Sequence, residues 1–144
     1  MSNDAKYWLV VVSKDHLESG KKLGTVQANH GKAAPLKRMR PSDFVVFYSP
    51  KLHFQGKEPY KKFTAIARAK EGDVYQADTG GGFKPYRRDV AFLPYGETEI
   101  EPLIPKLTFI RNKKSWGFVF RFGFFEIPSE DFETISKAMK KEAE

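Results

Sequence analysis

The segment that most constrains the fold lies at residues 40–48, where an Arg-Pro-Ser-Asp turn leads directly into an apolar run. Pro41 fixes its own φ near the value that turns require, and the Asp43 carboxylate can accept hydrogen bonds from the neighbouring backbone. The residues after Asp43 are β-branched and aromatic, which is typical of a buried strand. The turn therefore predicts a strand over residues 44–49 with a defined starting point.

Other apolar runs predict the remaining strands. They cover residues 7–12, 24–27, 63–69, 87–93 and 116–127. In the last run phenylalanine recurs at every second position from Phe118 to Phe124, which predicts a strand with one aromatic face in the core. Short helices are expected after Ser13, over residues 32–39 and after residue 99. A final helix is expected after Ser129, with an apolar stripe of Phe132, Ile135 and Met139.

The length of 144 residues and the apolar content of 40% suit one sizeable core. We therefore expect a single domain over residues 1–144, in the α+β class, with a curved mixed sheet, small peripheral helices and a C-terminal helix. The absence of cysteine excludes a disulfide framework and thiolate metal sites, and it fits a reducing cytoplasm. The apolar run at 7–12 is too short for a signal peptide or a membrane span, so we expect a soluble cytoplasmic protein without membrane contacts.

The charge balance favours a polyanionic partner. The formal net charge is +7 and the isoelectric point is about 9.5, which attracts nucleic acid without regard to sequence. Residues 21–40 and 102–123 each contain several cations and no carboxylate. Two such blocks predict one basic face. The alternative is a solvated surface that happens to be rich in lysine.

Four segments carry a resemblance to a known family. The Arg-Pro-Ser-Asp turn and its strand resemble a recurring segment of PUA-like domains, Lys/Arg-Pro-Gly-Asp followed by an apolar run that ends in Tyr. Residues 7–13 (YWLVVVS) resemble the opening strand of EVE domains, and residues 83–88 (FKPYRR) resemble a later segment that leads into a basic strand. Residues 107–116 (LTFIRNKKSW) resemble the late EVE signature, a Phe-Ile pair followed by Asn-Lys and Trp. Together these segments span most of the chain.

The chain is therefore identified as a member of the EVE (UPF0310-type) branch of PUA-like domains, related to the YTH and ASCH domains. The resemblance implies a pseudo-barrel with a pocket between the end of the first strand, residues 24–32 and the second strand. Related domains extrude one nucleotide and hold its base in such a pocket, stacked on aromatic rings. The resemblance thus implies a non-catalytic reader of a modified base in RNA or DNA.

One position departs from the family pattern. In several branches, and in YTH domains, the residue two positions after the equivalent of Gly24 is a Trp that walls the pocket, whereas this chain has Val26. A valine cannot stack on a base as an aromatic ring does. Either another aromatic residue completes the cage, with Tyr48, Trp116 and Phe83 as candidates, or the ligand differs. The residues after Val26 are rich in amides, which can pair with the edge of a base.

These considerations give a set of candidate site residues. The expected pocket residues are Ser13, Lys14, Gln27, Asn29, His30, Gly31, Tyr48, Ser49 and Trp116. The expected contacts to phosphates are Lys32, Lys37, Arg38, Arg87 and Arg88. Each has a structural alternative, such as a turn residue satisfying local backbone for Asn29 or a core anchor for Trp116. The histidines at 16, 30 and 53 share no metal-ligand spacing, so we expect neither a metal nor another cofactor.

Three functions compete on this sequence. The first is a non-catalytic, monomeric module that binds RNA or modified DNA. The second is an enzyme such as a nucleotide hydrolase, which the sequence does not favour because it has no thiol, no Ser-His-Asp motif and no convincing carboxylate pair. The third is a small-molecule or nucleotide sensor, or a partner-binding domain, that uses the same pocket.

Overall fold

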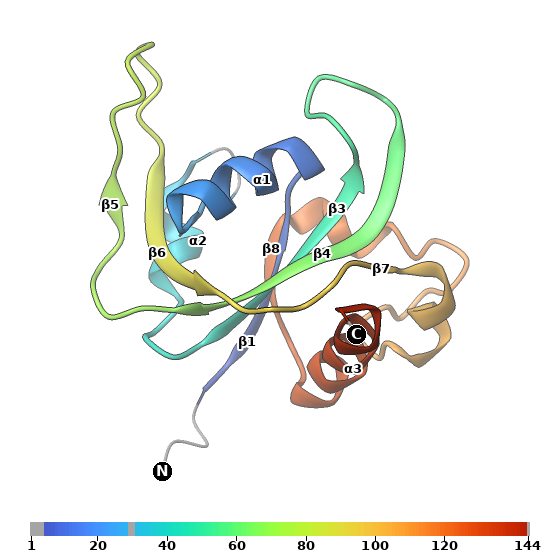
Figure 1. Ribbon diagram of the computed structural model, residues 1–144. Coiled ribbons are helices and arrows are strands. Elements are labelled where there is room, and N and C mark those ends of the chain that lie inside the picture. Colours follow the sequence, from blue (N-terminus) through green and yellow to red (C-terminus); the bar gives the residue numbers. More distant parts are fainter. Residues whose placement is uncertain (1–4, 29–30, 144) are drawn as a thin grey trace.

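A computed structural model describes residues 5–28 and 31–143, and its centre is a strongly curved sheet (Figure 1). The strands are β1 (Tyr7–Val11), β2 (Thr25–Val26), β3 (Phe44–Lys51), β4 (Pro59–Ala69), β5 (Tyr75–Gln76), β6 (Tyr86–Phe92), β7 (Thr98–Glu99) and β8 (Phe124–Ile127). The α-helices are α1 (Lys14–Leu23), α2 (Ala33–Lys37) and α3 (Ser129–Ala143). Two 3₁₀ helices, η1 (Glu101–Lys106) and η2 (Phe118–Phe122), complete the described structure.

The sheet is mixed. Its strands are hydrogen-bonded in the order β2-β6-β4-β3-β1-β8, with β5 on β6 and β7 on β4. β1 and β3 run parallel, and the other pairs are antiparallel. The sheet curls around α1, while α3 and η1 lie on its other side (Figure 1). The predicted α+β fold, a curved sheet with peripheral helices and a C-terminal helix, is confirmed.

Burial on both faces explains the continuous apolar run of β1. Trp8 and Val10 point into a cluster with Leu17 of α1, whereas Leu9 points into a second cluster with Ile135 of α3. Neighbouring residues of a strand face opposite sides of the sheet, so a strand with helices on both sides needs apolar residues at every position. Full burial of each such side chain stabilises the fold by about 1.5–3 kcal/mol.

The turn before β3 anchors two strands. The Asp43 carboxylate, 2% exposed, accepts a hydrogen bond from the Arg40 backbone N–H at 3.0 Å, which confirms the predicted local contact. It also accepts bonds from the Lys6 N–H and from Trp8 Nε1, each at 2.9 Å. Both of these donors come from the start of β1. One buried carboxylate therefore holds the turn and the parallel pair β1–β3 in register.

Replacing Ser42 by glycine is expected to stabilise the protein. Ser42 has φ +76° in a turn that Pro41 begins and that the Asp43 N–H closes by donating to the Arg40 carbonyl at 3.1 Å. A side chain at such φ costs about 1–2 kcal/mol in the folded state, and glycine avoids this cost. The greater freedom of glycine in the unfolded chain offsets about 0.4–1 kcal/mol of that gain. Ser42→Gly should raise the free energy of unfolding by roughly 0.5–1 kcal/mol in urea titrations. Ser42→Ala keeps the Cβ and should not raise the free energy of unfolding. An equal rise in both variants would show that the backbone at Ser42 is not strained.

The prediction of a strand over residues 116–127 is confirmed only for residues 124–127. These residues form β8, which pairs with β1 on the side away from β3, and residues 118–122 form η2. On this side β1 is in register only with residues 124–127, so the backbone that precedes them bonds largely within itself. The N–H groups of Phe118, Phe120 and Gly123 donate to the carbonyls of residues 115, 117 and 120. Gly123, at φ +75°, then redirects the chain into β8.

The predicted aromatic face also fails as a continuous core. Phe120 and Phe124 are buried, but Phe118 and Phe122 are 58% and 62% exposed. The 3₁₀ helix has three residues per turn, so positions two apart no longer share a side. Arg121 covers the ring of Phe118, with its guanidinium carbon 5.4 Å from the ring centroid. Half of the alternating phenylalanines therefore belong to the surface.

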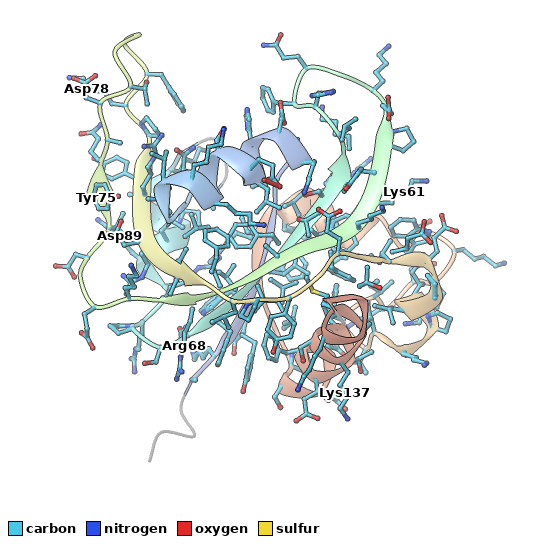
Figure 2. All side chains as sticks on the ribbon, in the orientation of Figure 1. Lys61, Arg68, Tyr75, Asp78, Asp89 and Lys137 are labelled. Atoms are coloured by element: carbon cyan, nitrogen blue, oxygen red, sulfur yellow. The ribbon has the colours of Figure 1, made fainter. Side chains whose placement is uncertain are left out.

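The ribbon of β5 and β6 extends beyond the body of the domain (Figures 1 and 2). Tyr75 of β5 donates to Asp89 of β6 at 2.7 Å, and Figure 2 shows the two side chains together. A loop that contains the glycine-rich residues 78–82 connects the two strands, and the Asp78 carboxylate accepts a hydrogen bond from the Gly80 N–H at 2.9 Å. Within the described residues no helix is long and apolar enough to cross a membrane.

Candidate functional site

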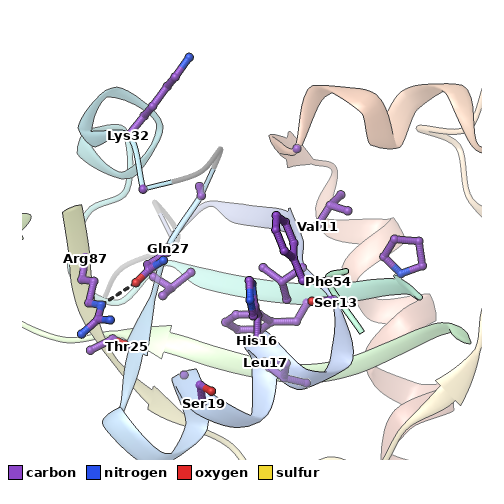
Figure 3. Close-up of a pocket in the computed structure, with 18 of the residues that line it drawn as sticks. Val11, Ser13, His16, Leu17, Ser19, Thr25, Gln27, Lys32, Phe54 and Arg87 are labelled. Carbon is purple, nitrogen blue, oxygen red and sulfur yellow. Dashed lines mark hydrogen bonds between the residues drawn. The ribbon is translucent and has the colours of Figure 1, made fainter. Parts of the chain in front are cut away.

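A cavity of about 810 Å³ opens beside α1 (Figure 3). The end of β1, residues 25–28 and 31–32, and the end of β3 line it, and these belong to the segments between which the resemblance places a pocket. Phe83, Phe120, Arg121 and Gly123 complete the wall. The volume lies within the range of about 300–1,000 Å³ that small-molecule sites occupy, so the cavity is large enough for a nucleobase.

The floor of the cavity is apolar. Leu17, Val26 and Phe47 line it and are each no more than 2% exposed. Phe120 of η2 closes one side and is also buried. A flat apolar ring that packs against these side chains would leave water, which is favourable by about 25 cal/mol for each Å² of apolar surface buried.

A fixed amide stands at the wall. Arg87 Nε donates to Gln27 Oε1 at 2.6 Å, and Figure 3 shows this contact joining β6 to the segment after β2. The carbonyl oxygen of the Gln27 amide is therefore occupied by a cation. Its NH₂ group retains two donors. A ligand beside Gln27 meets a hydrogen-bond donor whose direction is set by Arg87.

Near the end of β1, Ser13 and Asp15 carry hydrogen-bond acceptors, in contrast to the donors of Gln27. Ser13 Oγ, in a residue only 5% exposed, donates to Asp15 Oδ1 at 2.5 Å, so the hydroxyl retains lone pairs for a ligand. The same carboxylate accepts bonds from the His16 and Phe54 N–H groups. Burial alone would raise the pKa of Asp15, but these hydrogen bonds outweigh it and hold the pKa below its usual value. Asp15 thus stays ionised and ties α1 to the loop that carries Phe54.

An aromatic pair that the sequence analysis missed stands at the cavity wall. The rings of His16 and Phe54 stack with centroids 4.7 Å apart and an interplanar angle of 18°. Both line the cavity, and Phe54 is 41% exposed (Figure 3). Phe54 lies in a polar connection after β3, where no periodic pattern marks it. His16 was considered only as a metal ligand, so its stacking partner could not be inferred.

Val26 lines the cavity at the position where the family pattern has Trp, and it is 1% exposed. Of the three rings considered as replacements, Phe83 reaches the cavity. Tyr48 instead packs in the core against Phe120 at 4.3 Å between centroids, and burial raises its pKa. Trp116 meets the edge of Phe120 at 6.4 Å and lies under the ammonium of Lys61 at 5.8 Å.

Only some of the predicted pocket residues line the cavity. Ser13, Gln27 and Gly31 line the cavity, whereas Lys14, Tyr48, Ser49 and Trp116 do not. The hydroxyl of Ser49, which is fully buried, hydrogen-bonds to Thr64 Oγ1 at 2.9 Å between β3 and β4. Asn29 and His30 lie outside the described residues, so their predicted role stays a prediction.

Lys14 is engaged away from the cavity. Its ammonium pairs with Glu18 at 2.7 Å and with Glu97, and it lies 5.9 Å from the ring centroid of Tyr60. Burial would lower the pKa of Lys14, but the hydrogen bonds to the two carboxylates outweigh this and raise it. The residue therefore joins α1 to the segment before β7 rather than presenting a free cation to a ligand.

The predicted phosphate contacts fall into three places. Lys32 and Arg87 line the cavity. Lys37 and Arg88 line a second, separate cavity of about 400 Å³. Arg38 covers the ring of Trp8, with its guanidinium carbon 5.3 Å from the centroid, and donates to the Phe124 carbonyl at 3.3 Å.

Two cations of the cavity, Lys51 and Arg121, were missed, although a signal for Arg121 was present. Arg121 lines the cavity from η2, and it belongs to the second stretch of cations without a carboxylate. Across residues 5–28 and 31–143, no group of three or more His, Cys, Asp or Glu side chains is arranged to hold a metal ion. The described cavity therefore combines an apolar floor, a fixed amide and a basic rim.

Solved structures of similar shape support the fold assignment. The YTH domain of the Zygosaccharomyces rouxii MRB1 protein, in complex with N6-methyladenosine RNA, aligns with a TM-score of 0.68 at 14% identity and covers 96% of this chain and 87% of its own. Human THYN1, in complex with 5-methylcytosine containing DNA, aligns with a TM-score of 0.54 at 14% identity and covers 96% and 99%. At these identities the likeness shows the fold alone, which is the PUA-like fold that the sequence predicted.

Sequence comparison shows the family. The EVE domain family matches residues 6–138. A UPF0310 protein from Bacillus licheniformis, encoded in the gntR 5′ region, is 49% identical over 129 residues, which cover 90% of this chain and 88% of that protein. The match includes the opening strand, the Arg-Pro-Ser-Asp turn and the late Phe-Ile signature. This chain therefore belongs to the EVE domain family.

Proposed function

We propose that this EVE domain is a non-catalytic nucleic-acid-binding module that holds one extruded, modified base in the cavity beside α1. The observation that carries the proposal is the apolar cavity of about 810 Å³ with the Gln27 amide fixed at its wall by Arg87. The two structural neighbours described above are in complex with N6-methyladenosine RNA and 5-methylcytosine containing DNA, which supports a nucleic acid as the ligand.

The cavity offers each interaction that an extruded base needs. The stacked pair of His16 and Phe54 and the ring of Phe83 supply aromatic surface, and the donors of Gln27 face an acceptor on the edge of the base. Extrusion costs a few kcal/mol, and stacking returns about 1–3 kcal/mol for a base. Stacking and one or two hydrogen bonds are therefore sufficient for recognition.

The basic rim completes the proposed interface. Lys32, Arg87 and Arg121 line the same cavity, where a strand entering with its base would bring its phosphates. The Ser13 hydroxyl donates to a carboxylate and His16 stacks on Phe54, so the described residues of the cavity form no Ser-His pair for nucleophilic catalysis. Binding without chemistry is the role that this arrangement supports.

The direct test compares matched oligonucleotides. Fluorescence anisotropy should be measured for single-stranded RNA and DNA that differ only in one base, with N6-methyladenosine and 5-methylcytosine among the modified bases. We expect one modified oligomer to bind more tightly than its plain counterpart, and affinity to fall steeply with salt. Equal affinity for every matched pair, with no binding at physiological salt, would overturn the proposal. Free nucleosides that bind as tightly as the oligomers would instead indicate a small-molecule sensor.

Gln27→Ala should weaken binding of the preferred oligomer by about ten-fold. The change removes the donors at the base edge and also leaves Arg87 Nε without its acceptor at 2.6 Å. Loss of one such hydrogen bond costs about 1–1.5 kcal/mol, which corresponds to this factor. Gln55→Ala is the matched control, because Gln55 is exposed and lies outside the cavity. An unchanged affinity of the Gln27 variant for the modified oligomer would place the base elsewhere.

A further inference from the structure

The second cavity is built from three cations on different segments. It has a volume of about 400 Å³ and lies between the end of α2, the turn at 71–74 and β6. Lys37 comes from α2, Arg40 from the turn before β3, and Arg88 from β6. α2 packs beside β6 in the fold (Figure 1), so the site joins elements that the sheet holds in place.

Arg88 is a buried cation without a counterion. The residue is 4% exposed, and its guanidinium donates from Nη2 to the Lys70 carbonyl at 3.1 Å. Its Nε is buried and has no hydrogen-bond partner, and no carboxylate of the described residues lies within 4.0 Å of the guanidinium. Buried charges in proteins are normally paired, because an unpaired one loses its hydration without compensation. The buried guanidinium of Arg88 therefore favours an anion as its partner.

The nearby carboxylates do not supply that anion. Glu71 and Asp73 also line the cavity, but both are exposed on a turn and neither forms an ion pair with Arg88. Asp89, next to Arg88 in β6, accepts the hydroxyl of Tyr75 at 2.7 Å. Exposed carboxylates are hydrated and screened by salt, so the buried charge at this site is positive.

β6 lines both cavities, and α2 runs from a residue of the first cavity to a residue of the second. Arg87 lines the first cavity and Arg88 the second, because adjacent residues of a strand point to opposite faces. Lys32 precedes α2 and lines the first cavity, while Lys37 ends α2 and lines the second. The five residue steps from Lys32 to Lys37 span about 7.5 Å along the helix axis, so these two cations are close enough to contact one strand of nucleic acid.

We propose that the second cavity binds a backbone phosphate of the same nucleic-acid strand whose base occupies the first cavity. This inference rests on the proposed function, because it names the contact that follows the extruded base. Arg88 supplies the buried guanidinium, whose planar fork suits phosphate oxygens, and Lys37 and Arg40 supply exposed cations at the rim. Binding at this site does not depend on the base sequence, since the site contacts only the backbone.

The test replaces Arg88 by methionine, which has a similar length and no charge. We expect Arg88→Met to bind both plain and modified oligomers about ten-fold more weakly and to reduce the slope of log affinity against log salt by about one. Its midpoint of urea unfolding should equal or exceed that of the wild type, because the change removes an unpaired buried charge. Arg68→Met is the control for lost charge, since Arg68 is exposed on β4 and lies outside both cavities (Figure 2).

Inorganic phosphate provides a readout without nucleic acid. At constant ionic strength, phosphate in place of chloride should raise the thermal midpoint of the wild type and of Arg68→Met, and should not raise that of Arg88→Met. A variant Arg88→Met that unfolds more easily and binds oligomers as the wild type does would make Arg88 a structural residue and overturn the inference. Weaker binding of plain oligomers by Arg88→Met would support the phosphate site whether or not a modified base is preferred. A lack of preference for any modified base would contradict the proposed function and not the phosphate site.

Discussion

Asp43→Ala is expected to lower the free energy of unfolding by about 3 kcal/mol. The carboxylate accepts three hydrogen bonds at 2.9–3.0 Å, from the N–H groups of Lys6 and Arg40 and from Trp8 Nε1. Alanine would leave these donors without a partner in a region where Asp43 is 2% exposed. Hydrogen bonds to a charged acceptor are each worth about 1.5–3 kcal/mol, and partial access of water to the gap limits the total loss.

Urea unfolding followed by tryptophan fluorescence measures this effect, because Trp8 is itself one of the donors. Asp43→Asn keeps one acceptor oxygen and should recover part of the loss. Asp73→Ala serves as the control for removing a carboxylate, since Asp73 is exposed on the turn after β4. A loss below about 1 kcal/mol for Asp43→Ala would show that the turn and the register of β1 on β3 do not depend on this carboxylate.

Gly31→Ala should destabilise the protein by about 2–5 kcal/mol and impair the cavity. Gly31 has φ +82°, where a side chain costs about 1–2 kcal/mol. A Cβ built at this position would lie 2.6 Å from Pro85 Cβ and 2.9 Å from Pro85 Cα, so the segment before β6 would have to move. Overpacking of this kind costs about 1–3 kcal/mol more.

The movement would reach the proposed binding residues. The Gly31 carbonyl accepts the Tyr86 N–H at 2.8 Å, and Phe83 and Arg87 line the cavity on either side of that contact. We therefore expect oligonucleotide affinity to fall at temperatures where the variant is still folded. Gly81→Ala is the control, because a Cβ at Gly81 meets nothing within 4 Å. Equal unfolding midpoints and affinities for the two alanine variants would contradict the close approach of Gly31 to Pro85.

Local patterns predicted much of the sheet. The runs that became β1, β3 and β6 contain enough β-branched and aromatic residues to identify these strands within one or two positions, whereas the run at 63–69 identified β4 without its first four residues. The stripe of Phe132, Ile135 and Met139 identified α3, and all three side chains are buried against the sheet. These predictions succeeded because burial of each residue follows from its immediate neighbours in the chain.

The alternating phenylalanines before β8 show where local pattern fails. Their period of two is typical of a strand, but a strand also needs a partner along its length. On this side β1 provides strand partners only for residues 124–127, so residues 118–122 form η2 instead of extending the strand. The length of a neighbouring strand that is more than one hundred residues away in sequence decided this, and no window around Phe120 contains that information.

The same limit applies to the candidate site. Ser13, Gln27 and Gly31 were identified because the resemblance places residues of these segments at a pocket, and they line the cavity. Tyr48 was assigned to the pocket from the same strand end, yet its ring faces Phe63 and Phe120 in the core. The direction of a side chain at a strand end depends on the irregular register between β3 and β4 after Phe47.

By itself, the sequence determined the family, the α+β class, the local hydrogen bond within the turn at Asp43 and the excess of positive charge. These depend on residue identity and on contacts between near neighbours. Only the tertiary structure decided that His16 stacks on Phe54, that Arg87 fixes the amide of Gln27, and that Arg88 is buried with no counterion among the described residues. Each of these depends on elements that approach each other through the curvature of the sheet, and curvature is a property of the packed strands rather than of any one of them.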